Sequence, residues 1–242
     1  MTATCPLCGA VEPTRLFESR DRVHNLPGIF TVFRCQRCEA VSYHPRLQAG
    51  ELSRYYPEIY GRYRYSKSIH KKKYGGIRQF VLENWYGYPS PEKRTPSLIN
   101  KWTAFFLSFV MAKNAIPYRG DGNILDIGCG GGSTLYRLRQ WGWNAYGVEP
   151  SAAGAAQARS LGLNVYQGQI EDARFPDSLF DVIRLNHVLE HLTDPHGTMR
   201  EIGRILKPEG IVYITVPNTR SLNFWLFGEN WYGLDAPRHV VS

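Results

Sequence analysis

The sequence predicts an α/β fold in which helices cover a parallel sheet. Two observations carry this prediction. Between residues 123 and 216, short apolar runs alternate with longer segments of helical periodicity, which is the order typical of a parallel sheet. The first apolar run also leads directly into a glycine-rich turn. A chain of 242 residues is long enough for one such domain and a small additional module.

The glycine-rich turn is the first candidate for a ligand site. Gly128, Gly130 and Gly132 would let the backbone pass close beneath a ligand at the carboxyl end of the strand. A dinucleotide fingerprint has its third glycine where this chain has Ser133. The turn also follows the acidic Asp126, and a carboxylate disfavours a pyrophosphate at a helix N-terminus but suits an ammonium group.

The later elements of the expected core follow in order. The second strand, 144–148, ends at Glu149, which lies 21 residues beyond Gly128, and this is the spacing of an acidic residue that binds a ribose diol. Ser151 is expected to cap the next helix, and Asp194-Pro195 to begin a later one. The remaining strands are expected at 164–167, 180–185 and 211–216, with a turn at 207–210 before the last.

Four of the five cysteines form two Cys-x-x-Cys pairs near the N-terminus. Four thiolates are the soft ligands that tetrahedral zinc prefers, and a site closed by four sulfurs has no open position for catalysis. We expect a structural zinc-ribbon module over residues 1–44. Cysteines used in this way indicate a reducing compartment, and we expect a cytoplasmic protein. The predicted zinc ligands are Cys5, Cys8, Cys35 and Cys38.

Residues 45–119 would connect this module to a core at 120–242. Seven basic residues and no acidic ones lie between Arg62 and Arg78, and without them the net charge of +8 would be +1. The alternatives are a helical linker with a solvated basic face, a surface that binds nucleic acid, and a lid that holds a phosphorylated substrate. No apolar run is long enough to span a bilayer. The tyrosines interleaved with this patch are Tyr55, Tyr56, Tyr60, Tyr63, Tyr65 and Tyr74.

From residue 124 to 218, about two-fifths of the chain, these segments resemble the core of the class I S-adenosylmethionine-dependent methyltransferases. The resemblance implies a Rossmann-like sheet with S-adenosylmethionine as the cofactor. Its methionine end would lie at the turn, its ribose at Glu149, its adenine at Gln169 and Ile170, and its sulfonium near Asn186 and His187. The implied cofactor-binding residues are Asp126, Gly128, Cys129, Gly130, Gly132, Glu149, Gln169, Ile170, Asn186 and His187.

The zinc module, the His-Val-Leu-Glu-His segment and residues 231–239 narrow the resemblance to bacterial methyltransferases associated with sugar and surface-polysaccharide biosynthesis. This implies methyl transfer to a sugar or sugar nucleotide in polysaccharide or secondary metabolism. A hydroxyl acceptor needs a base, and we rank His239 above His191 for that role. Two alternatives stay open: an RNA methyltransferase that uses the basic patch, and a non-catalytic cofactor-binding or scaffolding protein.

The end of the core is expected to be short. Class I methyltransferases usually continue with two further strands, whereas the 26 residues after Val216 have no clean alternating pattern. We therefore expect five strands, with 211–216 at an edge that promotes self-association unless the aromatic segment 224–227 or the N-terminal module covers it. A fragment of a longer product would be poorly soluble and weakly active.

Overall fold

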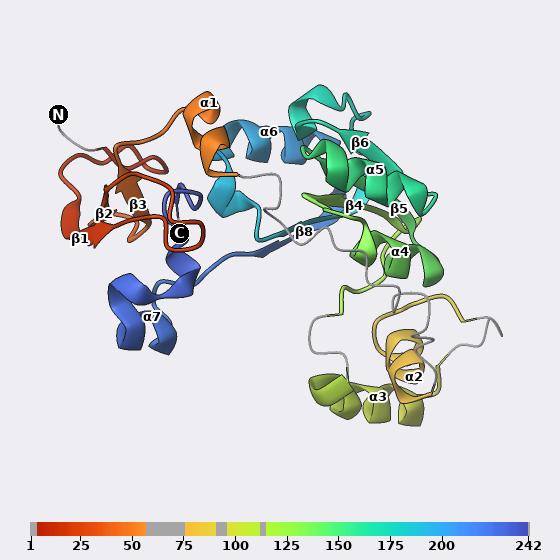
Figure 1. Ribbon diagram of the computed structural model, residues 1–242. Helices are drawn as coiled ribbons and strands as arrows, with labels where there is room; N and C mark the ends of the chain where they lie inside the picture. The colour runs from red at the N-terminus through yellow and green to blue at the C-terminus, as the bar shows by residue number, and fades with distance from the viewer. Residues whose placement is uncertain (1–3, 57–75, 91–95, 112–114, 242) are drawn as a thin grey trace. The chain divides into compact units, whose positions relative to one another are not determined.

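The computed structural model describes residues 4–56, 76–90, 96–111 and 115–241 (Figure 1). The chain divides into two compact units. The first combines Met1–Arg62, Leu185–Arg200 and Ile214–Ser242, and the second combines Tyr63–Arg184 and Glu201–Tyr213. The division expected at residues 44 and 119 stays a prediction. Most of the basic patch, and four of the six tyrosines, lie at 57–75, outside the described residues.

A five-stranded sheet forms the centre of the second unit, in the order β6-β5-β4-β7-β8. The β4–β5 and β5–β6 pairs are parallel. This confirms the predicted α/β class with a five-stranded parallel sheet, and it places the last strand at an edge. β7 and β8 each continue for two residues into the first unit. The strands are β4 Asn123–Ile127, β5 Asn144–Glu149, β6 Asn164–Gln167, β7 Phe180–Asn186 and β8 Leu206–Thr215.

Strands β4 and β7 are buried along most of their length because helices and loops cover the sheet. Figure 1 shows α4 (Ser133–Gln140) and α5 (Ala152–Ser160) beside β4, β5 and β6. Leu135 of α4 and Ala158 of α5 pack in one buried cluster with Val165 of β6. A second cluster joins Ile124 and Val182 of the sheet to residues of α2 (Ile77–Asn84) and the segment after it. Helix α3 (Leu98–Met111) packs against α2.

The residues that directly follow α6 (Pro195–Ile205) have a different structure from the one predicted. The turn expected at 207–210 is wrong, because these residues belong to β8. Pro208 has no N–H to donate, and an edge strand tolerates this because one of its sides has no partner strand. Lys207 is held by Asp121 and Asp181, whose carboxylate oxygens lie 2.7 and 2.8 Å from its Nζ.

The first unit contains an antiparallel sheet in the order β1-β2-β3. Phe30 and Val32 of β2 and Val41 of β3 bury their side chains against Leu234 and Ala236 from the other end of the chain. The C-terminal segment therefore completes the core of the N-terminal sheet. The strands are β1 Thr14–Ser19, β2 Phe30–Arg34 and β3 Val41–His44. The helices are α1 Ala49–Leu52, η1 Ser53–Tyr55, η4 Leu189–His191, α7 Leu222–Phe227, η5 Gly228–Asn230 and η6 Tyr232–Leu234.

Across the described segments, no helix combines the length and the apolar character needed to cross a membrane.

Candidate functional site

The turn after β4 has a backbone that only glycine adopts without strain. Gly128, Gly130 and Gly132 have φ values of +68°, +55° and +78°. A Cβ atom on Gly132 would lie 2.5 Å from Leu163 Cδ1 and 2.8 Å from Ala158 Cβ. The turn is thus packed tightly against the end of α5, which fixes the path of its backbone.

The amide groups of this turn form hydrogen bonds within the protein. Gly128 N and Cys129 N donate to the Val148 carbonyl at 2.8 and 3.2 Å. Gly130 N donates to Glu149 Oε2 at 2.7 Å. A pyrophosphate binds to amides that point outward at a helix N-terminus. This turn therefore does not fit a dinucleotide phosphate, as its acidic neighbour also indicates.

Glu149 ends β5 and is 5% exposed. Besides the Gly130 amide, its carboxylate accepts a hydrogen bond from Ser151 N at 2.9 Å. Ser151 Oγ in turn accepts from Gly154 N at 3.2 Å and caps α5, as the sequence predicts. A carboxylate can accept about four hydrogen bonds, so accepting from these amides does not preclude binding a ribose diol. The backbone thus holds this carboxylate at the end of its strand.

Asp126 is buried beside an arginine. Its side chain is 1% exposed, and Arg184 Nη1 of β7 lies 2.6 Å from its Oδ1. Burial raises the pKa of Asp126, the Arg184 guanidinium lowers it, and the Glu149 carboxylate raises it again. When ionised, Asp126 and Glu149 place two negative charges at this end of the sheet. Negative charge here suits a positively charged ligand such as an ammonium or a sulfonium.

Cys129 takes part in the turn through its backbone amide rather than through its thiol. Burial raises the pKa of this thiol, and the carboxylates of Asp126 and Glu149 raise it further, so the sulfur stays protonated and chemically quiet. The side chain packs in the cluster that holds Leu135 and Ala155.

The segment expected at adenine follows β6. Gly168 N donates to the Glu149 carbonyl at 3.2 Å, which ties this segment to the end of β5. Ile170 is buried and begins the short helix η3 (Ile170–Asp172), whereas Gln169 is exposed. The structure therefore brings together Asp126, the turn, Glu149 and residues 169–170 at the carboxyl ends of three neighbouring strands.

Asn186 and His187 belong to the first unit. His187 has a φ of +56°, and its Nδ1 lies 3.1 Å from Glu190 Oε1. The contact of both residues with a cofactor stays a prediction.

The four cysteines expected to bind zinc lie together in the first unit. Cys5 Sγ is 3.5 Å from Cys38 Sγ, and Cys8 Sγ is 3.5 Å from Cys35 Sγ. All four sulfurs lie within 4.8 Å of one another. Tetrahedral zinc with Zn–S bonds of about 2.3 Å holds its sulfurs roughly 3.8 Å apart. The sulfur spacing fits this ion.

The two cysteine knuckles share one backbone pattern. Gly9 N donates to the Cys5 carbonyl at 3.0 Å, and Glu39 N donates to the Cys35 carbonyl at 2.9 Å. Gly9 and Glu39 also share a positive φ, +70° and +60°. Both Cys-x-x-Cys pairs thus form the same turn, which directs two sulfurs from each to one point.

The two histidines expected to act as bases also lie together in the first unit. The ring centroids of His191 and His239 are 4.6 Å apart. His239 Nδ1 lies 2.8 Å from the Gly233 carbonyl, and His191 Nδ1 lies 3.1 Å from the Arg238 carbonyl. Because a carbonyl only accepts, Nδ1 of each ring carries the hydrogen and Nε2 carries the lone pair. Burial lowers the pKa of His191 to about 4, and it also lowers the pKa of His239.

Residues 93–242 match a family model described as a methyltransferase domain, which is more than half of the chain. The chain belongs to the methyltransferase-domain family. This membership agrees with the five-stranded parallel sheet and with the glycine turn after β4.

Two relatives of this methyltransferase-domain protein are named ubiquinone biosynthesis O-methyltransferase. The one from Pseudomonas aeruginosa is 34% identical over 111 residues, which cover 43% of this chain and 47% of the relative. The one from Methylococcus capsulatus is 32% identical over 161 residues, which cover 63% of this chain and 65% of the relative. The chain thus spans only about half to two-thirds of their length. These names do not support the narrower resemblance to sugar-associated methyltransferases.

Solved structures match over a similar share of the chain. One is described as an S-adenosylmethionine-dependent methyltransferase, possibly a histamine N-methyltransferase, from Thermotoga maritima. It is 26% identical, with a TM-score of 0.42 over 55% of this chain and 64% of that chain.

Two arginines were missed by sequence reasoning. Arg184 had a signal, because it is a basic residue within the mainly apolar run of β7. Arg238 had none. Its side chain is 0% exposed, and its Nη1 and Nη2 donate to both oxygens of Asp21 at 3.2 and 2.7 Å, across 217 positions of sequence. Its Nε also donates to Asp235 at 3.0 Å.

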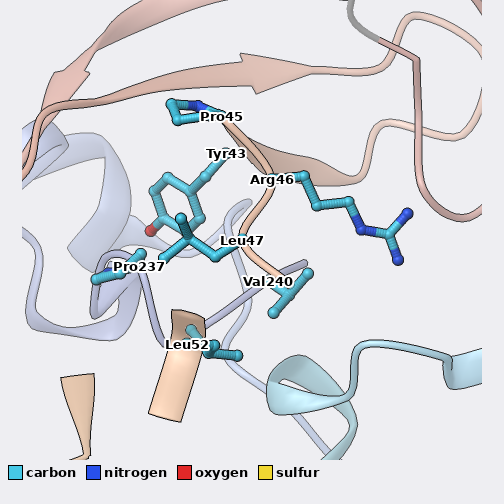
Figure 2. A pocket seen from close by; sticks show the side chains of 7 residues that line it. All are labelled: Tyr43, Pro45, Arg46, Leu47, Leu52, Pro237 and Val240. Carbon is cyan, nitrogen blue, oxygen red and sulfur yellow. The ribbon is translucent and has the colours of Figure 1, made fainter. Parts of the chain in front are cut away.

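A small pocket lies between β3 and the C-terminal segment (Figure 2). Tyr43 forms one wall, and its hydroxyl donates to the Leu234 carbonyl, while burial raises its pKa. Arg46 supplies the charge in this lining, and Figure 2 shows its side chain extending away from the tyrosine ring. The mainly apolar lining offers no base or metal ligand set. The lining residues are Tyr43, Pro45, Arg46, Leu47, Leu52, Pro237 and Val240.

Proposed function

We propose that this chain binds S-adenosylmethionine at the carboxyl ends of β4, β5 and β6 and transfers its methyl group to a small-molecule hydroxyl. The observation that carries the proposal is the buried Glu149 carboxylate, bound to the amide of Gly130 in the glycine turn. It would place an acceptor for a ribose diol directly against a turn in which the amides of Gly128, Cys129 and Gly132 donate to protein carbonyls. Membership of the methyltransferase-domain family supports the same assignment.

When bound, S-adenosylmethionine supplies a methyl group that its sulfonium charge already activates for transfer. The protein's task is to bind and orient. Asp126 and Glu149 would attract the positive charge of the ligand, because both side chains are negatively charged when ionised. The glycine backbone would pass under the methionine end. Gln169 and Ile170 would flank the adenine, with the Gln169 amide oxygen as acceptor for its amino group.

The acceptor hydroxyl loses a proton as its oxygen bonds to the methyl carbon, and the electron pair of the broken carbon–sulfur bond goes to sulfur. The sequence predicts that His239 or His191 accepts this proton. In each ring Nδ1 is bound to a carbonyl, so Nε2 is the nitrogen that would take the proton.

Two hydroxyl classes are the candidate acceptors. A phenolic hydroxyl is supported by the names of the relatives, which describe O-methyl transfer in ubiquinone biosynthesis. A sugar hydroxyl, free or phosphorylated, rests on the sequence resemblance alone. Phenols ionise near pH 10, as tyrosine does, and therefore need less help from a base than sugar hydroxyls.

The test is calorimetry with S-adenosylmethionine, followed by transfer of labelled methyl groups to phenols, sugar nucleotides and RNA. We expect binding of the cofactor and label in one of the two small-molecule classes. Preferential binding of NADH would overturn the cofactor assignment. If label is found only in RNA, and binding weakens steeply with salt, the acceptor is RNA rather than a small molecule.

We also propose that Cys5, Cys8, Cys35 and Cys38 hold one structural zinc ion. The spacing of their sulfurs and the matching knuckle turns support it. Metal analysis of freshly purified protein should find an equivalent of zinc that Cys35→Ser removes, while cofactor affinity stays near normal. Less than half an equivalent in the wild type would count heavily against the site.

Self-association through β8 is a further part of this proposal. β8 is the last strand of the five in the described sheet, and an edge of this kind presents unpaired backbone groups. Light scattering should show a dimer or larger species that dissociates on dilution. A monomer at high concentration would remove this part of the proposal.

A further inference from the structure

A second group of metal-ligating side chains lies in the first unit, distinct from the four cysteines. Glu190, His191 and His239 each offer one ligand atom, and these atoms lie within 4.8 Å of one another. Glu190 is 1% exposed, His239 is buried, and His191 is half-buried. Three ligand residues converge here although 48 positions separate His191 from His239.

The two histidines are oriented as metal ligands are. A ligating histidine typically donates its second ring N–H to a carbonyl, which fixes the ring and leaves the other nitrogen for the metal. His239 has this arrangement with the Gly233 carbonyl, and His191 has it with the Arg238 carbonyl. The Tyr56 hydroxyl, 2.9 Å from His191 Nδ1, further restrains that ring. Nε2 of both rings is therefore the nitrogen that offers a lone pair.

Glu190 supplies an independent indication of a missing ligand. Its Oε1 lies 3.1 Å from His187 Nδ1, but its buried Oε2 has no hydrogen-bond partner among the described residues. Burying a carboxylate oxygen without a partner is costly, because water is lost and nothing replaces it. The fold nevertheless holds this residue in place, since the Glu190 carbonyl accepts from Val240 N at 2.6 Å. A cation would compensate the buried charge.

We propose that Glu190, His191 and His239 form a second metal site, which binds a divalent transition metal such as Zn²⁺. Two imidazoles and one carboxylate are a ligand set that suits such ions and disfavours Mg²⁺ and Ca²⁺. Ligand bonds of about 2.1 Å place tetrahedral ligands roughly 3.4 Å apart, so small side-chain rotations close the site. Three protein ligands leave a fourth position open to an oxygen of water or substrate, unlike the closed cysteine site.

Metal binding at this site would exclude a role as general base for the same histidine nitrogens. A metal bound to Nε2 of His191 and His239 uses the lone pairs that a general base needs. Metal binding and proton acceptance at these nitrogens are therefore alternatives. The metal proposal does not depend on methyl transfer, because its test measures binding directly.

The test is a Co²⁺ titration of the 242-residue chain as purified, followed by absorption spectroscopy. Cobalt bound by thiolates shows a sulfur-to-metal charge-transfer band, whereas cobalt bound by imidazole and carboxylate shows only ligand-field bands. We expect one equivalent that lacks the thiolate band, and we expect Zn²⁺ to displace it. Absence of such an equivalent in the wild type overturns the proposal, whatever metal the cysteines hold.

Variants then assign the ligands. Glu190→Gln and His239→Gln should each weaken binding of this equivalent at least tenfold. The matched control is His196→Gln, which changes a histidine of the same unit but keeps a donor for the Leu7 carbonyl, now 2.8 Å from His196 Nε2. An unchanged affinity in both ligand variants overturns the assignment. If circular dichroism shows that they do not fold, His191→Ala and the wild-type titration decide.

Discussion

Each unit contains an arginine paired with a buried aspartate, but the two centres are assembled differently. In the second unit, Arg184 binds Asp126 close to Glu149, and all three come from strands of one sheet. In the first unit, Arg238 binds Asp21 and Asp235 with no exposed side-chain surface of its own.

The partners of the carboxylates explain what each centre does. Asp21 accepts two hydrogen bonds from Arg238 and three from the amides of Val23, His24 and Leu26. Such a carboxylate is saturated and serves the fold. Glu149 instead holds the glycine turn and the start of α5 at the ligand-binding end of the sheet. We therefore expect changes in the Arg238 centre to alter stability and changes in the Arg184 centre to alter ligand affinity.

Arg238→Met should have the largest effect. It leaves Asp21 and Asp235 buried without their cation, and breaking a buried ion pair in this way costs about 3–5 kcal/mol of unfolding free energy. Urea unfolding measures it. Arg22→Met is the matched control, because Arg22 forms an exposed pair with Glu229 at 3.6 Å and should change stability by less than about 1 kcal/mol. Equal effects would contradict the contrast between the two centres.

Glu149→Ala should weaken S-adenosylmethionine binding. Losing a charged acceptor costs about 1.5–3 kcal/mol, which corresponds to on the order of tenfold or more in affinity. Calorimetry measures the dissociation constant. Glu149→Gln keeps one acceptor oxygen and should lose less, and the exposed Glu209→Ala should lose nothing. A dissociation constant unchanged in Glu149→Ala would refute the ribose assignment.

Lowering the pH should selectively weaken the Arg238 centre of the first unit. Burial raises the pKa of Asp21, but the hydrogen bonds from Arg238 and from the backbone outweigh it and hold the pKa at about 2, against an ordinary 3.8. Because the folded value is the lower one, the stabilisation of about 2 kcal/mol is complete above pH 4 and disappears as the pH falls towards 2. The stability gap between the wild type and Asp21→Asn should therefore narrow over this interval. A stability difference that stays constant over this pH interval would contradict the lowered pKa of Asp21.

Two glycine substitutions should give the smallest effects, with opposite signs. Gly132→Ala forces alanine to a φ of +78° against Leu163, at a cost of about 1–2 kcal/mol. Gly203→Ala is its control within α6, where an added Cβ meets nothing within 4 Å and should stabilise the helix by about 0.5–1 kcal/mol. Thermal unfolding of both variants checks the signs. Stabilisation by Gly132→Ala would contradict the turn geometry.

The part of the site at the strand ends could be predicted because its information is local. Apolar runs followed by glycine or by an acidic residue mark where β4 and β5 end. Parallel pairing then brings those ends to one edge of the sheet, so Asp126 and Glu149 had to be neighbours. Ser151 as a helix cap is an equally local signal. The turn at 207–210 failed because local turn propensity at Pro208 and Gly210 was overridden by extension of the edge strand.

The sequence by itself determined the α/β class, the glycine turn, the acidic end of β5 and the grouping of cysteines into two equivalent knuckles. Periodicity, spacing and backbone preference act within a few residues, so they are visible without a structure. Only the tertiary structure decided that Arg238 would meet Asp21, that Leu234 would complete the core of the N-terminal sheet, and that Glu190 would lie beside His239. These contacts join distant segments, and what selects them is burial: an ion pair or a carboxylate that loses water must find its partner wherever the fold brings one.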